Sequence, residues 1–565
     1  MPWCMGRRRS PNPLFALISA LFCAWALFAL IGGAAPGATA ATYYVSPTGN
    51  DANAGTSPAR PWKTLAKVSS RWFSAGDNIL FQADQTFAGT LSFGPHATGT
   101  PTRPVIVGSY GTGRAILQAG AGDGISVYNT AGIVIRNLIV QGGWSFANQD
   151  GNTGVGIQVF TDKKGAVKLD TMIIANCEVS GFRNGGIVLG GWPVDGSKSG
   201  FKHVRITGCA VHDNGQAGIV SYGYFDAKST RYAHADIYVG HCTVYNNQGV
   251  AGNTNNSGSG QGIVLGDVQF GTVERCVAYG NGHSYATYQG GTVGIWTYDS
   301  DHVTLQYNES YNNISNLVDG DGFDLDGGAT NCVMQYNYSH DNGGAGFLFA
   351  QYPGARPYRH NVVRYNVSQN DGRTVGYGSL HFWNGGSGIT DCEVFNNTVY
   401  SSAATNGPQP SAVYITTPTT NVHLRNNVFI ASGGAPLIDV VAGQEGLLFQ
   451  ENDYWPADGD SVLRWNGVDY TTLKDWRLAT GQEMLLGREI GLSVDPLLMA
   501  AGQGPTIGNA DNLSILTAYR LRKSSPLWNA GLALQELFAV SPGPVDFYGT
   551  PLSRRTFSIG ACQTP

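Results

Sequence analysis

A repeat in the middle of the chain limits its fold more than any other feature. Short segments that end in a polar turn, such as GCAVHDN, HCTVYNN and YNYSHDN, recur many times. One column of this repeat holds the following residues: Asn137, Cys177, Cys209, Cys242, Cys276, Asn308, Asn337, Asn366, Asn397 and Asn427. After a first step of 40 residues that spans an insertion, the steps are 32, 33, 34, 32, 29, 29, 31 and 30 residues. Such a period is typical of a solenoid, in which each unit stacks on its neighbours.

A second column precedes the first and shares one register. It consists of five-residue strands that begin with a small residue: Gly156, Gly186, Gly218, Gly262, Gly294, Gly322, Gly346, Ser379 and Ala412. No unit contains a convincing helix, and two staggered strand columns stacked about 4.8 Å apart form a parallel β-helix. We therefore predict an all-β, single-stranded parallel β-helix over residues 131–430. An N-terminal cap with the first coils would occupy residues 41–130, and irregular C-terminal coils with a cap residues 431–565.

The strand register predicts which side chains face the interior. Side chains alternate along a strand, so the second residue of each strand should point inward. This inner stack comprises Ile157, Ile187, Ile219, Ile263, Ile295, Phe323, Phe347, Leu380 and Val413. The neighbouring positions should then form a solvent-exposed face. On it we expect the following aromatic, acidic and histidine side chains to gather: Tyr222, Trp296, Tyr298, Asp324, Asp326, His381, Trp383 and Tyr414.

Four aspartates in eight residues form the densest acidic cluster, DGDGFDLD. Their mutual repulsion must be compensated by a cation, a proton or a substrate. Asp319 and Asp321 lie in a Gly-rich turn, where they either shape the turn or bind calcium through hard oxygen ligands. Asp324 and Asp326 sit on a strand, where acidic residues are disfavoured. We interpret that pair as functional, because residues that break local rules concentrate at sites.

Composition and the N-terminus narrow the class of partner. The formal net charge is −5, with no basic surplus, which does not favour nucleic acid. Arg7 to Arg9, an apolar run and Ala38-Thr39-Ala40 indicate a signal peptide over residues 1–40, with an uncleaved membrane anchor as the alternative. We expect a monomer that is secreted to the periplasm or the medium and is free of the membrane after cleavage.

The cysteines, asparagines and His-Asp-Asn sequences of the repeat have structural explanations. Nine cysteines suggest disulfides in an exported protein. However, those in the repeat column point one per coil into the stack, which favours free buried thiols. The asparagines of the same column predict an amide ladder. The sequences His212-Asp213-Asn214 and His340-Asp341-Asn342 occupy equivalent turns, so repetition of the fold explains them better than catalysis.

The chain resembles secreted bacterial proteins of the pectate-lyase-like right-handed β-helix superfamily. The resemblance rests on the N-terminal YYVSPTGNDANAGTSPARPWKTLAKV, the asparagine ladder and the C-terminal YRLRKSSPLWNAG and DFYGTPLSRRTFSIGAC. It implies a right-handed β-helix and a carbohydrate-active context. In polysaccharide lyase family nine, a D-D-G-[WF]-D segment binds calcium and a lysine one coil later is the base. Asp321, Phe323 and Asp324 match that segment, whereas Gly320 replaces its first aspartate and Leu348 occupies the lysine position.

Three functions follow from these residues. The first is a glycoside hydrolase with Asp324 and Asp326 as the acid/base pair, because outward positions two residues apart on a strand are about 6.5 Å apart. It would need no cofactor, with His381 as an auxiliary group. The second is a calcium-assisted polysaccharide lyase acting on uronate chains, with Arg356, Arg359 or His381 as base. The third is a non-catalytic glycan-binding protein. Each would hold a polysaccharide on its aromatic side chains: Tyr222, Trp296, Tyr298, Trp383 and Tyr414.

Overall fold

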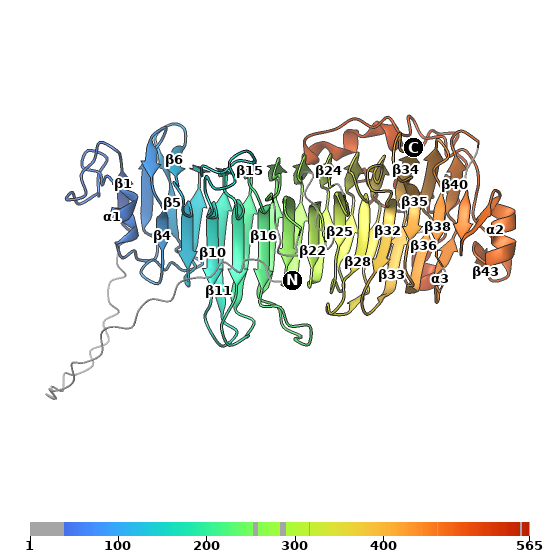
Figure 1. Cartoon of the computed structure of the whole chain (residues 1–565), viewed down its shortest axis with the longest axis horizontal. Helices are drawn as coiled ribbons and strands as arrows, with labels where there is room; N and C mark the ends of the chain where they lie inside the picture. Colours follow the sequence, from blue (N-terminus) through green and yellow to red (C-terminus); the bar gives the residue numbers. More distant parts are fainter. Residues whose placement is uncertain are drawn as a thin grey trace.

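The computed structural model describes residues 39–251, 258–282, 290–315, 317–441, 443–459, 462–553 and 556–563. Figure 1 shows an elongated solenoid whose strands stack along the long axis. In the described ranges the strands form three long sheets of 15, 14 and 13 strands, which we call sheet 1, sheet 2 and sheet 3. Each coil contributes a strand to each sheet in turn, and the pairing between coils is parallel. The predicted all-β, single-stranded parallel β-helix is confirmed.

Sheet 1 contains β1 (Thr42–Val45), β2 (Asn78–Gln82), β5 (Val105–Tyr110), β8 (Ile133–Arg136), β11 (Lys168–Ala175), β14 (Gly200–Thr207), β17 (His234–Gly240), β20 (Val268–Glu274), β23 (Asp301–Gln306), β26 (Val333–Gln335), β29 (Tyr358–Arg359), β30 (Val362–Arg364), β33 (Ile389–Phe395), β36 (Thr420–Arg425) and β39 (Leu448–Gln450). Sheet 2 contains β4 (Leu91–Phe93), β7 (Ile125–Tyr128), β10 (Ile157–Thr161), β13 (Ile187–Gly191), β16 (Ala217–Gly223), β19 (Gln261–Gly266), β22 (Val293–Tyr298), β25 (Asp321–Leu325), β28 (Phe347–Gln351), β32 (Gly378–Asn384), β35 (Ser411–Ile415), β38 (Ile438–Val440), β41 (Leu463–Trp465) and β42 (Val468–Tyr470). Sheet 3 contains β3 (Thr86–Ala88), β6 (Ala115–Gln118), β9 (Leu138–Gln141), β12 (Glu178–Ser180), β15 (Ala210–His212), β18 (Thr243–Tyr245), β21 (Val277–Tyr279), β24 (Glu309–Tyr311), β27 (Tyr338–His340), β31 (Val367–Gln369), β34 (Thr398–Ser402), β37 (Val428–Ser432) and β40 (Asp453–Pro456).

Helices are short and lie outside the coils. Helix α1 (Leu65–Ser69) is capped by the Thr64 side chain, and α2 (Leu473–Thr480) buries Trp476 against Phe449 and Trp465. The remaining elements are the 3-10 helices η1 (Ala510–Ile515) and η2 (Thr517–Tyr519), α3 (Leu534–Phe538), and the hairpin of β43 (Met484–Leu485) and β44 (Arg488–Glu489).

The predicted signal segment lies outside the described residues, except for its last two positions. In the part of the chain that the structure describes, no helix is long and apolar enough to span a membrane.

The predicted inner stack of sheet 2 is confirmed. Ile295, Phe323 and Phe347 are fully buried, and the rings of Phe323 and Phe347 stack with centroids 5.3 Å apart. All nine predicted positions are at most 1% exposed. This phase turns Asp324 away from the core, because neighbouring residues on a strand face opposite sides.

Two polar ladders fasten the turns between sheets. Asn337 donates from Nδ2 to Oδ1 of Asn366 at 3.0 Å and accepts from Asn308 at 3.1 Å, so the predicted amide ladder is confirmed. The four cysteines of the same column are buried and form no disulfide, as predicted. A second ladder was not predicted as such: it runs through Asn214, Asn247, Asn281, Asn313 and Asn342, and it ends on Asp371.

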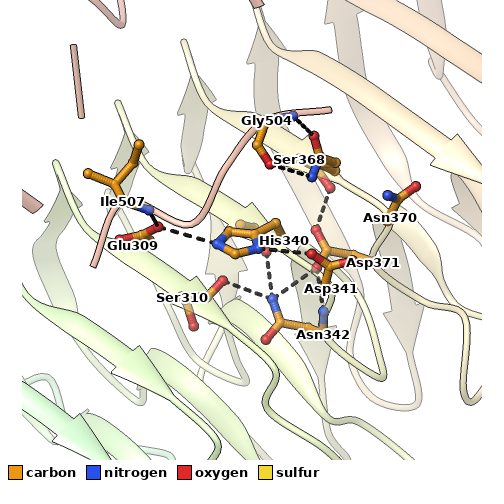
Figure 2. A network of polar contacts seen from close by, with 12 residues as sticks. Glu309, Ser310, His340, Asp341, Asn342, Ser368, Asn370, Asp371, Gly504 and Ile507 are labelled. Carbon is orange, nitrogen blue, oxygen red and sulfur yellow. Dashed lines mark hydrogen bonds and ion pairs between the residues drawn. The ribbon is translucent and has the colours of Figure 1, made fainter. Parts of the chain in front are cut away.

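The chain after Leu497 folds back along the outer face of sheet 3, beside β24 and β34 (Figure 1). The hydroxyl of Tyr519 donates to Oε1 of Gln369 at 2.7 Å. The buried carboxylate of Glu309 accepts the backbone N–H groups of Ile507 and Gly508 at 2.7 and 2.6 Å, and it lies 3.3 Å from Nε2 of His340 (Figure 2). The His340-Asp341-Asn342 turn thus takes part in fastening the C-terminal segment.

Candidate functional site

The acidic cluster lies at β25 on the outer side of sheet 2. In the pairing of neighbouring coils, Asp324 lies between Trp296 and Leu348, and the row continues to His381 and Tyr414. The sequence-predicted residues of this row are therefore brought together. The prediction that the face is exposed is wrong for most of them, since Asp324 is 3% exposed, Trp296 9% and His381 2%.

A second layer of side chains covers this face. On the N-terminal side, Trp296 and Tyr298 belong to an apolar cluster with Tyr222, Val220 and Val264. On the C-terminal side, Tyr377 packs with the outward residues Leu348 and Ala350. Loops that do not follow the repeat supply part of this layer, so the strand register alone could not reveal it.

The four carboxyl groups differ in access to solvent. Asp321 and Asp324 are buried, whereas Asp319 and Asp326 are partly exposed. Oδ2 of Asp319 accepts the backbone N–H of Gly291 at 2.6 Å, and Oδ1 of Asp326 accepts that of Gly327 at 2.6 Å. Asp321 accepts the N–H of Ala345 through Oδ1. Its Oδ2 and Oδ1 of Asp324 are buried without a hydrogen-bond partner among the described residues.

Burial and mutual repulsion retain protons in this cluster. Burial, followed by the negative charge of Asp319, raises the pKa of Asp326 to about 7, against the lowering effect of the Gly327 N–H. Burial and the charges of Asp326, Asp321 and Asp319 raise the pKa of Asp324 well above its usual range. Burial raises the pKa of Asp319 too, but the N–H of Gly291 opposes that rise. At pH 7 the carboxyl group of Asp326 is therefore present both as the acid and as the carboxylate.

The turn that carries Asp326 is held from both sides. The backbone N–H of Asp299 donates to the carbonyl of Gly327 at 2.7 Å. Oε1 of the buried Gln351 accepts the N–H of Gly328 at 2.9 Å. A Cβ at Gly327 would come within 2.3 Å of the Tyr352 ring, so this close contact requires glycine. Gln351, the last residue of β28, and Tyr352, which follows that strand, were not predicted.

His381 is buried as a neutral imidazole. Burial lowers its pKa to about 3, and neither ring nitrogen has a hydrogen-bond partner in the described structure. Its ring contacts the edge of Tyr377 at a centroid distance of 4.1 Å and lies 5.0 Å from Tyr414. Burial and the charges of Asp319 and Asp321 raise the pKa of Tyr377, a residue that was not predicted.

The predicted aromatic side chains divide into covered and open ones. Trp296 donates from Nε1 to Oε1 of Gln261 at 3.1 Å, and its ring lies 5.3 Å from that of Tyr298. Tyr222 is 6% exposed. Trp383, at 40% exposure, and the partly exposed Tyr414 are the open members of the set.

Among the described residues, neither predicted arginine forms an ion pair with the four carboxyl groups of the cluster. Arg356 is 4% exposed, with Nε 3.1 Å from Oδ1 of Asp299 and Nη2 3.3 Å from Oδ1 of Asp267. These ion pairs already engage its guanidinium. Arg359 is an exposed residue of β29 in sheet 1, outside the face that carries Asp324.

Calcium binding by Asp319 and Asp321 stays a prediction. In the described ranges, no group of three or more His, Cys, Asp and Glu side chains could hold a metal ion. Asp319 and Asp321 each direct one oxygen at a backbone N–H instead. We therefore assign no chemical step to calcium.

Comparisons with known proteins agree with the architecture. Residues 174–399 match the family described as "Right handed beta helix region", which confirms the expected handedness. The chain is 26% identical to Lacto-N-biosidase of Bifidobacterium longum subsp. longum over 480 residues, which cover 69% of this chain and 29% of that protein. It thus spans less than a third of the curated relative that it matches.

One solved structure gives the same result for the fold. The GH136 lacto-N-biosidase from Eubacterium ramulus is 21% identical, with a TM-score of 0.50 over 66% of this chain and 67% of that chain. Pectate lyase Pel9A is 15% identical, with a TM-score of 0.37 over 93% of this chain and 96% of that chain.

Proposed function

We propose that this protein is a glycoside hydrolase whose catalytic carboxyl groups come from the cluster Asp319–Asp326. The observation that carries the proposal is the pKa of about 7 of the partly exposed Asp326, in a cluster that also contains the partly exposed Asp319. A glycosidase needs a carboxylic acid and a carboxylate on either side of the bond it cleaves. The name shared by the curated relative and the GH136 structure supports the same class.

Asp326 takes the role of proton donor. At neutral pH a substantial fraction of its carboxyl groups is protonated, and its proton would pass to the leaving glycosidic oxygen. Asp299 and Gln351 hydrogen-bond to Gly327 and Gly328, which directly follow Asp326. These bonds fix the direction of the Asp326 side chain. A proton donor must be fixed in this way, because misplacement by about 1 Å can cost about 100-fold in rate.

Asp319 takes the role of the ionised partner. The N–H of Gly291 stabilises its negative charge, and that charge in turn helps Asp326 to keep its proton. Asp324, the partner of Asp326 in the sequence-based hypothesis, is more deeply buried, and burial raises its pKa well above the usual range. We propose that Asp324 raises the pKa of its neighbours and is not itself the acid or the base. Substitution of each aspartate in turn distinguishes the pair Asp319 and Asp326 from the pair Asp324 and Asp326.

The substrate is a carbohydrate chain held by aromatic side chains near the carboxyl groups. Trp383 and Tyr414 supply open rings, and Tyr377 lies beside the carboxyl groups themselves. Lacto-N-biosidase activity is the first to test, because it is the activity named for the relatives. We further propose that the protein acts outside the cytoplasm as a monomer after removal of residues 1–40, and that hydrolysis requires no metal.

One assay tests the class of reaction. The chain from Ala41 is incubated with p-nitrophenyl lacto-N-bioside and with neutral and uronate polysaccharides, with and without EDTA. New reducing ends that persist in EDTA support the hydrolase. Unsaturated products that disappear in EDTA would instead establish the calcium-assisted lyase. Binding without any product, unchanged in Asp326→Asn, would leave a glycan-binding protein and refute both enzymes.

A further inference from the structure

Four aromatic side chains form a row on the outer side of sheet 2, several coils before the acidic cluster. This row, which we call the aromatic strip, consists of Tyr128, Phe160, Trp192 and Tyr224. Tyr128 and Phe160 are paired positions of β7 and β10, while Trp192 and Tyr224 directly follow the paired glycines that end β13 and β16. Successive coils therefore contribute one ring each.

The rings of the strip lie close together and reach solvent. Tyr128 and Phe160 stack with centroids 6.2 Å apart and planes 11° apart. Trp192 and Tyr224 lie 5.1 Å apart at 56°, which makes an angled pair. Tyr128 is 36% exposed, and the other three are partly exposed. A contiguous exposed aromatic surface on a folded protein commonly marks a binding site.

The strip rests on the apolar cluster that extends to the acidic site. Phe160 and Trp192 pack against this cluster, which includes Trp296 and Tyr298. A Cβ at Gly190 would come within 2.7 Å of both Phe160 and Tyr222, so glycine here lets both rings lie against the sheet. The strip and the acidic site are therefore connected by one buried apolar cluster.

A buried ion-pair network holds the support of the strip rigid. Nζ of Lys198 lies 2.8 Å from Oδ2 of Asp267 and also donates to the carbonyl of Tyr224. Arg356 joins Asp267 to Asp299 and donates to the carbonyl of Arg231 at 3.0 Å. The Lys198, Asp267, Asp299 and Arg356 side chains are at most 4% exposed. Rigid anchors bind better, because less conformational entropy is lost.

We propose that the aromatic strip is a distal binding surface for neutral polysaccharide chains. Its rings offer apolar area to the C–H groups of sugar rings. Beside them, Asp162 accepts from the Tyr128 hydroxyl at 2.5 Å and from Nδ2 of Asn129 at 2.7 Å, which provides polar groups for sugar hydroxyls. Charges of both signs border the strip, so a polyanion gains no net attraction: Asp162, Asp195, Asp226, Lys163, Lys164 and Lys228.

This surface has a function of its own beyond catalysis. It would hold a long chain several coils away from the carboxyl groups and raise its local concentration there. Short substrates that fill only the acidic site would not sense it. This binding surface and the proposed hydrolase both take carbohydrate ligands. Binding at the strip does not depend on the hydrolysis reaction.

Affinity electrophoresis tests the proposal with the chain from Ala41 and its Asp326→Asn variant. Native gels contain xyloglucan, galactomannan or mixed-linkage β-glucan, with polygalacturonate as the charged comparison. We expect at least one neutral polysaccharide to retard the protein. Trp192→Ala and Tyr128→Ala should each weaken this retardation about tenfold, the loss typical of a truncated aromatic anchor. Trp72→Ala is the matched control, since Trp72 is 77% exposed but lies outside the strip.

Each result has a defined meaning. Absence of retardation by all three neutral polysaccharides would overturn the proposal, as would stronger retardation by polygalacturonate. Equal retardation of the strip variants and Trp72→Ala would also overturn it. Should Trp192→Ala unfold, Trp192→Phe and Tyr128→Ala carry the test. Retardation that depends on the strip, without any cleavage, supports the binding surface and refutes the hydrolase. Cleavage of short substrates without retardation supports the hydrolase and refutes the binding surface.

Discussion

The backbone N–H of Gly291 donates a 2.6 Å hydrogen bond to Oδ2 of Asp319, across neighbouring coils of the β-helix. A hydrogen bond to the charged form of a carboxyl group favours that form. This contact distinguishes Asp319 from Asp324, whose Oδ1 has no hydrogen-bond partner among the described residues. The N–H of Gly291 therefore opposes the rise in the pKa of Asp319 that burial causes.

The pH dependence of hydrolysis should follow the proton on Asp326. Because the pKa of Asp326 is raised to about 7, the proton donor is lost as the pH rises through that value. We expect kcat/KM to fall about tenfold per pH unit well above pH 7. A pH–rate profile of the native chain measures this. A flat profile from pH 6 to pH 9 would exclude Asp326 as the acid.

Substitution of Asp324 should stabilise the protein at alkaline pH. Burial raises its pKa far above 3.8 in the folded state, so stability is lost as pH rises from about 4 toward the folded pKa. Asp324→Asn cannot ionise, and its melting temperature at pH 8 should exceed that of the native chain by about 2 °C or more. The difference should vanish at pH 4. Equal melting temperatures at both pH values would contradict the burial of an ionisable group here.

Loss of one amide from the asparagine ladder should destabilise the coils. Asn337 is fully buried and donates to the Leu305 carbonyl at 2.9 Å as well as to Asn366. Asn337→Ala leaves buried polar partners unsatisfied, which should cost about 3 kcal/mol. Denaturant unfolding measures the change, with the exposed Asn406→Ala as control. Similar midpoints for both variants would show that the ladder adds little.

The C-terminal segment should detach when Glu309 is removed. Glu309 is fully buried and receives the N–H groups of Ile507 and Gly508 together with His340 (Figure 2). Glu309→Ala should expose the chain near residue 505 to proteases at least tenfold faster, because the two N–H groups lose their acceptor. Mass spectrometry of limited digests locates the cut. Glu445→Ala, at an exposed position, should digest like the native chain.

The fold and part of the site could be predicted because the repeat sets the register of each strand. Phe323 pairs with Ile295 of the preceding coil, and both face inward. Asp324 pairs with Trp296, and both face outward. The cover over that face could not be predicted. Tyr352 and Tyr377 approach from loops without the period of the coils, and their positions depend on contacts with Gly327 and His381.

The sequence also could not predict that Asp319 is partly exposed whereas Asp324 is buried. Alternation along a strand distinguishes inside from outside, but it does not report which outward side chains other loops bury. Nor could periodicity place the C-terminal segment on sheet 3, since Tyr519 reaches Gln369 across 150 residues. Contacts of that separation leave no regular pattern in the chain.

Turnover by three single variants tests the central assignment most directly. With whichever glycoside the native chain hydrolyses, Asp319→Asn and Asp326→Asn should each lose about 100- to 10,000-fold in kcat. Asp324→Asn should lose clearly less and show a shifted pH profile, with all three variants folded by circular dichroism. Near-native turnover by Asp326→Asn, or full loss in Asp324→Asn with Asp319→Asn still active, would contradict the account.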